Sequence, residues 1–252
     1  MTSSEDTAIR LYGDLLIRCI ANTIYQDMPQ DPWSGGTYAE AIREEGRDWP
    51  SRAHSMIGVK RLENLRRLTE TALIDDIPGD FIETGVWRGG ACILMRGLLA
   101  AYNQRDRKVV VADSFEGLPP PDAERFPADA GDTHHEFREL AISFESVKAH
   151  FDAYGLLDGQ VEFLKGWFSD TLPTLAGRQF ALIRLDGDMY QSTIEALDNL
   201  YDLLSPGGFV IIDDYGAIPA CKAAVDEFRT QRGITEPMQP VDWTGTWWRK
   251  PR

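Results

Sequence analysis

The sequence has few cysteines and no apolar run long enough for a membrane span. Its three cysteines, Cys19, Cys92 and Cys221, are widely spaced within apolar helical patterns. This odd, scattered set is unlike a disulfide framework and suits reduced core thiols, so we expect a cytoplasmic protein. No apolar run approaches the roughly 20 residues that a bilayer span requires, and residues 1–7 lack the basic and apolar regions of a secretory signal. We therefore expect no membrane partner.

Basic residues are also scarce relative to acidic ones. The chain has 26 lysines and arginines against 40 aspartates and glutamates, a formal net charge of −14. Such a charge repels a phosphate backbone unless a basic face is separated from the rest. Arg61, Arg66 and Arg67 lie beside Glu63 and Glu70 at helical spacing, which is typical of a solvated helix face. The sequence thus argues against nucleic acid as a partner.

Alternating strand and helix patterns predict one α/β domain. The alternation predicts a parallel sheet with helices on both faces. Strands are expected at 80–84, 108–113, 161–165, 180–186 and 208–213, and helices at 91–102, 144–154, 190–204 and 219–232. Runs 238–243 and 246–250 are joined too closely for a helix to intervene, so they must pair antiparallel. A Rossmann-like, mostly parallel seven-stranded sheet that ends in such a hairpin is typical of class I methyltransferases, whereas dinucleotide-binding folds usually continue in parallel.

Residues 1–77 are predicted to form an N-terminal helical and lid segment, followed by a continuous core over 78–252. Apolar residues at intervals of three and four predict helices at 8–24 and 56–74. Between them, residues 26–50 are rich in Pro, Gly, Asp and aromatic residues. A loop this long in a compact domain is usually functional or mobile, so we interpret it as a lid.

A glycine-containing turn follows the first predicted strand. It reads Glu83-Thr84-Gly85-Val86-Trp87-Arg88-Gly89-Gly90 and leads into the helix that begins at Ala91. Glycines at such a turn let the backbone approach a ligand and aim the N–H groups of the helix at it. The spacing departs from the Gly-x-Gly-x-x-Gly pattern that holds a pyrophosphate. An ordinary strand-to-helix turn is the alternative interpretation.

The second predicted strand ends at Asp113, which Ser114 follows. An acidic side chain at this position can accept hydrogen bonds from both hydroxyls of a ribose. Because no arginine lies next to Asp113, a 2′-phosphate is disfavoured, while NAD and S-adenosylmethionine both fit. A helix cap is the alternative role for this aspartate.

Acidic residues gather where the fourth and fifth predicted strands end. Asp186 and Asp188 follow the fourth strand, and Asp213 and Asp214 end the fifth. The carboxyl ends of strands in a doubly wound sheet form the ligand crevice, so Asp186, Asp213 and Asp214 should converge there. Three carboxylates this close are costly without a cation. Oxygen ligands suit Mg²⁺, with Mn²⁺ or Ca²⁺ as alternatives, better than zinc, although a single strand-end aspartate is often a cap.

A cation at this position is suited to activating an alcohol. A bound divalent ion lowers the pKa of a hydroxyl and fixes its oxygen, and Asp186 can then take the proton. Transfer of a methyl group from a sulfonium further requires alignment and exclusion of water. His134 and His135 lie in the polar stretch 119–142, and adjacent histidines point in different directions. At most one is expected to reach the site, and an exposed structural role is favoured over acid–base catalysis.

Aromatic residues are candidates for an acceptor pocket. Because neighbouring residues of a strand point to opposite faces, at least one of Trp247 and Trp248 is expected in the core. The full set is Trp33, Tyr38, Trp49, Trp243, Trp247 and Trp248.

Jointly, these motifs resemble the macrocin O-methyltransferases, which methylate sugar hydroxyls in antibiotic biosynthesis. The resemblance covers most of the chain and rests on Ala53–Gly58, Glu83–Gly90, Asp113–Gly117, Gly166–Phe168, Asp186–Asp188 and Asp213–Tyr215. It implies S-adenosylmethionine as cofactor, Mg²⁺, and a glycosylated natural product of the macrolide or aminocoumarin type as the small-molecule substrate. It also implies a homo-oligomer, a dimer or larger, with the N-terminal helices contributing to assembly.

The resemblance also implies individual roles. Met56 and Ile57 would cover the cofactor, the Glu83–Gly89 loop would hold its amino-acid end, and Asp113 and Ser114 would meet its ribose. The rest of the expected cofactor site is Phe115, Gly117, Gly166, Trp167, Phe168 and Asp170. Asp186, Asp213 and Asp214 match the metal ligands, and Asp186 is also placed to act as the base, with His134 or His135 as the alternative. Segments 26–50 and 119–142 resemble the family least, so acceptor selection is expected there.

Three other functions stay open at this point. An NAD-dependent oxidoreductase shares the glycine turn and the strand-end Asp113 but leaves the acidic cluster without a role. A methyltransferase that acts on a catechol-like phenol uses the same cofactor and metal. A non-enzymatic adenosine or metal-binding module is the third.

Overall fold

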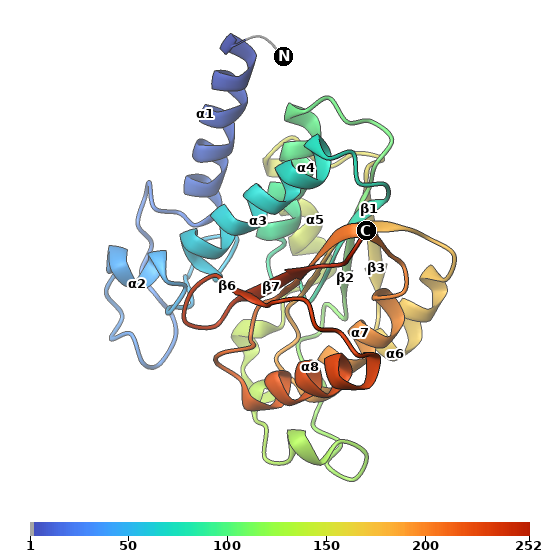
Figure 1. Cartoon of the computed structure of the whole chain (residues 1–252). Helices are drawn as coiled ribbons and strands as arrows, with labels where there is room; N and C mark the ends of the chain where they lie inside the picture. Colours follow the sequence, from blue (N-terminus) through green and yellow to red (C-terminus); the bar gives the residue numbers. More distant parts are fainter. Residues whose placement is uncertain (1–2) are drawn as a thin grey trace.

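A computed structural model of the chain describes residues 3–252, so residues 1–2 of the predicted N-terminal segment lie outside the described part. Its sheet has the strand order β3-β2-β1-β4-β5-β7-β6 (Figure 1). The strands are β1 (Asp80–Thr84), β2 (Val109–Asp113), β3 (Val161–Lys165), β4 (Phe180–Leu185), β5 (Leu204–Ile212), β6 (Gln239–Pro240) and β7 (Thr246–Arg249). The α-helices are α1 (Ser3–Ile20), α2 (Glu40–Glu44), α3 (Gly58–Ile74), α4 (Gly90–Ala101), α5 (Phe144–Ala153), α6 (Phe168–Thr171), α7 (Tyr190–Leu200) and α8 (Pro219–Arg232).

Strand pairing confirms the predicted sheet. Strands β1 to β5 pair in parallel, and β7 runs antiparallel to both β5 and β6. The chain moves outward from β1 to β3 and then returns to place β4 on the other side of β1. The carboxyl ends of β1 and β4 therefore form the topological switch point, where ligands bind in sheets of this kind.

Helices cover both faces of the sheet and define two apolar cores (Figure 1). Residues of α1, α3 and α4 share one core with the sheet, and residues of α7 and α8 share the other. Trp248 on β7 is fully buried in the second core, while Trp247 is partly buried against the first. This confirms that at least one of the two tryptophans belongs to the core, and shows the alternation expected along a strand.

The segment between α1 and α3 is held by a buried arginine that the sequence pattern did not predict. We call residues 26–57 the cover. Arg43, on the short helix α2, is completely buried and donates hydrogen bonds to Asp48 and Asp27 and to the carbonyl of Ala21. A bridge between Pro29 and Pro50 closes the base of the segment. The cover is thus an ordered unit built around one guanidinium.

His54 joins the cover to α1 and α4. Its backbone N–H donates to the carbonyl of Ile20, and its own carbonyl accepts from the N–H of Gly90. Burial, with help from the nearby His150 and Arg88, lowers the pKa of His54 from 6.5 to about 4. The fold therefore favours the neutral imidazole.

We expect the His54→Asn variant to lose part of the acid sensitivity of the fold. Because the folded pKa lies below the unfolded one, the contribution of His54 to stability is present above about pH 6.5 and is lost as the pH falls towards 4. The test is to measure melting temperatures in buffers from pH 7.5 to pH 4.5. Tyr154→Phe is the control, because it removes only the hydroxyl that is hydrogen-bonded to the His54 imidazole. Equal acid sensitivity in His54→Asn and the unaltered chain would contradict the assignment.

Among residues 3–252, no helix combines the length and the apolar character that crossing a membrane would require.

Candidate active site

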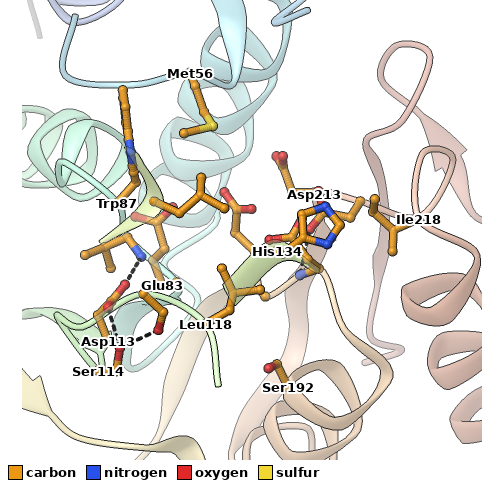
Figure 2. Close-up of a pocket in the computed structure, with 18 of the residues that line it drawn as sticks. Met56, Glu83, Trp87, Asp113, Ser114, Leu118, His134, Ser192, Asp213 and Ile218 are labelled. Carbon is orange, nitrogen blue, oxygen red and sulfur yellow. Dashed lines mark hydrogen bonds between the residues drawn. The ribbon is translucent and has the colours of Figure 1, made fainter. Parts of the chain in front are cut away.

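A cavity of about 540 Å³ opens at the switch point of the sheet. The loops that follow β1, β2, β4 and β5 line it, and the cover closes part of it. In Figure 2, Asp113 and Ser114 lie at one end, and Asp213, His134 and Ile218 lie at the other. The predicted cofactor and metal residues thus share one space.

The glycine turn after β1 lies in direct contact with the end of β4. Gly85 has a φ of 80°, and a Cβ atom there would lie 1.7 Å from the carbonyl oxygen of Asp186. Only glycine fits at this point. The neighbouring Glu83 side chain is buried and accepts hydrogen bonds from Arg184 and from the Cys92 thiol. Burial raises the pKa of Glu83, and the Arg184 charge opposes that rise.

Asp113 ties the first turn to the second. Its carboxylate accepts hydrogen bonds of 2.7 Å from the backbone N–H groups of Val86 and Phe115. Burial raises the pKa of Asp113, and these hydrogen bonds act against the rise. Asp113 lines the cavity and organises both loops. The next helical turn along the chain begins only at Pro127, so the helix-cap alternative is wrong.

Most of the predicted cofactor residues line the cavity. The lining ones are Met56, Ile57, Glu83, Gly85, Val86, Trp87, Asp113, Ser114, Gly117, Gly166, Trp167 and Phe168. The others named from the sequence, Thr84, Arg88, Gly89, Phe115 and Asp170, are not lining residues. The Arg88 side chain instead donates to the carbonyls of Pro50 and Ala53 in the cover. Phe115 packs edge-on against Phe144.

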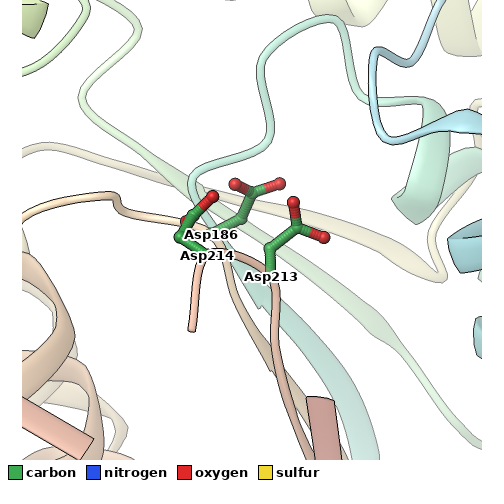
Figure 3. Close-up of side chains that lie close together, drawn as sticks. All are labelled: Asp186, Asp213 and Asp214. Carbon is green, nitrogen blue, oxygen red and sulfur yellow. The ribbon is translucent and has the colours of Figure 1, made fainter. Parts of the chain in front are cut away.

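Three carboxylates converge at the opposite end, as the strand ends predict. Ligand oxygens of Asp186, Asp213 and Asp214 all lie within 4.8 Å of one another, and the three side chains project to the same side of the strand ends (Figure 3). Burial and then the Asp213 charge raise the pKa of Asp186 well above its ordinary value. Burial and then the Asp188 charge do the same for Asp214. The cluster is therefore electrostatically unfavourable on its own and has the donor set of an oxygen-ligated divalent cation.

Asp188 and the loop 119–142 complete this end of the cavity. Burial raises the pKa of Asp188 to about 6, although His134 opposes the rise. His134 lines the cavity and contacts Asp132 at 2.7 Å, whereas His135 is not a lining residue. The loop is anchored by the buried Asp129, which accepts hydrogen bonds from the first two N–H groups of α7. No sequence signal distinguished Asp129 from the other acidic residues of the loop.

Arg61 is a correction to the sequence interpretation. It was expected on a solvated helix face, but its side chain is only 7% exposed and lines the cavity. It donates to Asp213, to Asp242 at 3.0 Å and to the carbonyl of Gly46 at 3.1 Å. The spacing of α3 placed Arg61 beside Glu63, but the tertiary fold brings α3 against the ends of β5 and β7. Arg67, by contrast, is exposed as expected.

Three of the six candidate aromatic residues reach the cavity. Trp33, Trp49 and Trp243 line it, and the Trp33 and Trp49 rings meet edge-to-face at 4.8 Å between centroids. Phe137, from the loop 119–142, packs against Trp49 at 5.2 Å. The cover and the loop 119–142 therefore meet through aromatic side chains beside the cavity.

This sheet order, the antiparallel end and the cavity at the switch point define a class I methyltransferase fold. The family model for macrocin O-methyltransferases matches residues 6–250. The chain therefore belongs to the macrocin O-methyltransferase family, and it is an O-methyltransferase.

Known relatives are similar over nearly their whole length. The chain is 49% identical to the demethyldecarbamoylnovobiocin O-methyltransferase of Streptomyces niveus, over 96% of this chain and 94% of the relative. It is 48% identical to the mycinamicin III 3''-O-methyltransferase of Micromonospora griseorubida, over 98% and 99%. The solved structure of the O-methyltransferase NovP, 49% identical, superposes with a TM-score of 0.91 over 97% of this chain and 100% of that one. A calicheamicin methyltransferase, CalS11, at 21% identity and a TM-score of 0.61 over 99% and 93%, shares the fold.

Proposed function

We propose that this enzyme transfers a methyl group from S-adenosylmethionine to a sugar hydroxyl of a glycosylated natural product, with a divalent cation at Asp186, Asp213 and Asp214. The observation that carries the proposal is the meeting, in one cavity, of the glycine turn after β1 with three converging carboxylates. The named relatives supply the reaction class.

The cofactor is assigned to the end of the cavity formed by β1 and β2. Gly85 and Gly89 have φ values of 80° and 84°, a conformation that glycine adopts without strain, so the turn can bring its backbone close to a ligand. Asp113 and Ser114 line this end of the cavity and are assigned to the ribose, and Met56 and Ile57, which line it from the cover, are assigned to the outer side of the cofactor. Thr84, Arg88, Gly89, Phe115 and Asp170 would shape these loops without lining the cavity.

The carboxylate cluster fits a hard divalent cation such as Mg²⁺, with Mn²⁺ and Ca²⁺ as the alternatives. When bound, the ion lowers the pKa of the acceptor hydroxyl and fixes its oxygen. We assign proton acceptance to Asp186, since it lies at the contact between the two halves of the cavity. Asp188 and His134, which also line the cavity, are the candidates if Asp186 serves only as a ligand.

The cavity wall favours a neutral sugar over a nucleotide sugar. Trp33, Trp49 and Trp243 offer faces on which a sugar ring can pack. Arg61 lines the cavity, but its charge is already engaged by Asp213 and Asp242, so little positive charge is left for a diphosphate. The names of two relatives give a novobiocin precursor and mycinamicin III as their substrates. We therefore propose a substrate that is already glycosylated, of the macrolide or aminocoumarin type.

Mass spectrometry of reactions with a panel of glycosylated macrolides and aminocoumarins tests the function. A product heavier by one CH₂ is expected with S-adenosylmethionine, and a chelator should abolish it until Mg²⁺ is restored. Catechols and nucleotide-linked sugars serve as competing acceptors. Methylation of catechol alone would favour the phenol alternative, and binding of NADH with no binding of S-adenosylhomocysteine would overturn the proposal.

Replacing Trp33 should weaken acceptor binding selectively. Trp33 lines the cavity yet is 56% exposed, so Trp33→Ala is expected to fold normally. We expect its acceptor KM to rise by roughly two- to tenfold, as loss of an aromatic contact of about 0.5–1.5 kcal/mol implies. Steady-state kinetics with Ile74→Ala, a more exposed apolar position outside the lining, provide the control. An unchanged KM would exclude Trp33 from the acceptor site.

We also propose a homo-oligomer. Leu11 and Leu15 on α1, and Tyr25 and Met28 just beyond it, are each more than half exposed. Apolar side chains gathered in this way are typical of a subunit interface. Light scattering after size-exclusion chromatography should give a mass above one chain, and Leu15→Glu should lower it.

A further inference from the structure

The acidic cluster is opposed by two buried arginines from different parts of the chain. Arg184, on β4, contacts Glu83, Asp186 and Asp213, so it is shared between the glycine turn and the cluster. Arg61, on α3, contacts Asp213 but neither of the other two proposed ligands. Asp213 thus has one oxygen engaged by each guanidinium.

Arg61 is held in place from its other side. Its Nε donates to Asp242 in the turn before β7, and its Nη2 donates to the carbonyl of Gly46 in the cover. A Cβ atom on Gly46 would lie 2.4 Å from Arg61 Nη2, and one on Gly245 would lie 3.0 Å from its Cδ. The side chain therefore has little room to move away.

We propose that Arg61 is a fixed counter-charge that competes with the divalent cation for Asp213 and so lowers the affinity of the site. This rests on the proposed cation site. The three carboxylates alone would attract a divalent ion strongly at short range. With two guanidinium charges against them, the cation has to share Asp213 with Arg61, so binding is weaker and more readily reversed.

The opposite role is also physically possible and predicts the opposite sign. A group that hydrogen-bonds a ligating carboxylate can orient it, and its loss then weakens metal binding by about 10- to 100-fold. Two other groups already orient Asp213: Arg184 donates to its Oδ1, and the Thr244 hydroxyl donates to its backbone carbonyl. Arg61 donates to Oδ2, so its guanidinium occupies an oxygen that the cation needs, and the charge argument prevails.

Direct Mn²⁺ titration followed by electron paramagnetic resonance tests the proposal without any turnover. Arg61→Gln should bind Mn²⁺ at least about tenfold more tightly than the unaltered chain, since a positive charge beside the ion is gone. Arg61→Lys, which keeps the charge, should stay within about threefold. Arg67→Gln removes the same charge from an exposed position of the same helix and should leave the affinity unchanged.

Each outcome has a defined meaning. If Arg61→Gln binds Mn²⁺ as tightly as the unaltered chain or more weakly, the proposed counter-charge role of Arg61 is overturned. If both Arg61→Gln and Arg61→Lys bind Mn²⁺ more weakly, Arg61 orients Asp213 instead. Absence of Mn²⁺ binding by the unaltered chain overturns the cation site itself, and the inference with it. If Arg61→Gln does not fold, crystals of the unaltered chain with and without Mn²⁺ decide. When Mn²⁺ is bound, the distance between Arg61 and Asp213 should increase, while the hydrogen bonds from Arg61 to Asp242 and to Gly46 persist. An Arg61–Asp213 distance that is the same with and without Mn²⁺ rejects the proposal.

Discussion

The Asp186→Asn variant is expected to fold, to bind S-adenosylhomocysteine like the unaltered enzyme, and to lose methyl transfer by about 100- to 10,000-fold, the range for loss of a general base. The substitution also removes one of the converging carboxylates and so weakens the proposed cation site. The cofactor end should be spared, because Gly85 meets only the backbone of Asp186 and an amide side chain leaves that contact intact.

Single-turnover kinetics and calorimetry with S-adenosylhomocysteine separate these effects. Asp202→Asn, at an exposed position that pairs with Arg232, controls for the loss of one carboxylate. Turnover that persists in Asp186→Asn would move the base elsewhere, and Asp188→Asn and His134→Asn would then distinguish the two remaining candidates. Loss of cofactor binding would instead mean that the strand end as a whole had been disturbed.

The Arg43→Met variant should suffer the largest loss of stability among the changes considered. Removing one partner of a buried ion pair costs about 3–5 kcal/mol, because the remaining charge stays buried without compensation. Here two such carboxylates, Asp27 and Asp48, would be left. Each kcal/mol lowers the melting temperature of a chain of this size by about 2–4 °C.

Hydrogen exchange shows whether the loss is local or global. Because Arg43 bonds mainly within the cover, we expect faster exchange over residues 26–57 and little change in β1 to β5. Arg47→Met is the matched control, since its side chain is 46% exposed. If the melting temperature of Arg43→Met lies within about 1–2 °C of that of the unaltered chain, Arg43 has no structural role of this size.

The sheet and its helices were accessible from sequence because each depends on local periodicity. Alternating strand and helix patterns placed β1 to β5 and α4 to α8 within a few residues, apart from the short helix α6, and the close spacing of 238–243 and 246–250 required an antiparallel pair. The converging aspartates followed from one topological rule, that strand carboxyl ends share an edge.

What the sequence did not reveal depends on long-range packing. In the sequence, Arg43 and Arg61 cannot be distinguished from exposed charged residues. Only the folded chain shows that both are buried among carboxylates. Asp129 similarly gains its capping role from α7, far along the chain. Likewise, Arg88 lies within the predicted cofactor loop, but its side chain donates hydrogen bonds to the carbonyls of Pro50 and Ala53 in the cover.

The contact between Gly85 and the Asp186 carbonyl has a consequence for how the reaction is aligned. The turn proposed to hold the methyl donor follows β1, and Asp186 follows β4, which pairs directly with β1. Asp213 and Asp214 follow β5, which pairs with β4. Their separation is therefore set when the sheet forms, and no movement between domains is needed to bring donor and acceptor together. Selectivity for different sugars can then change through the cover and the loop 119–142 while the reacting geometry stays the same.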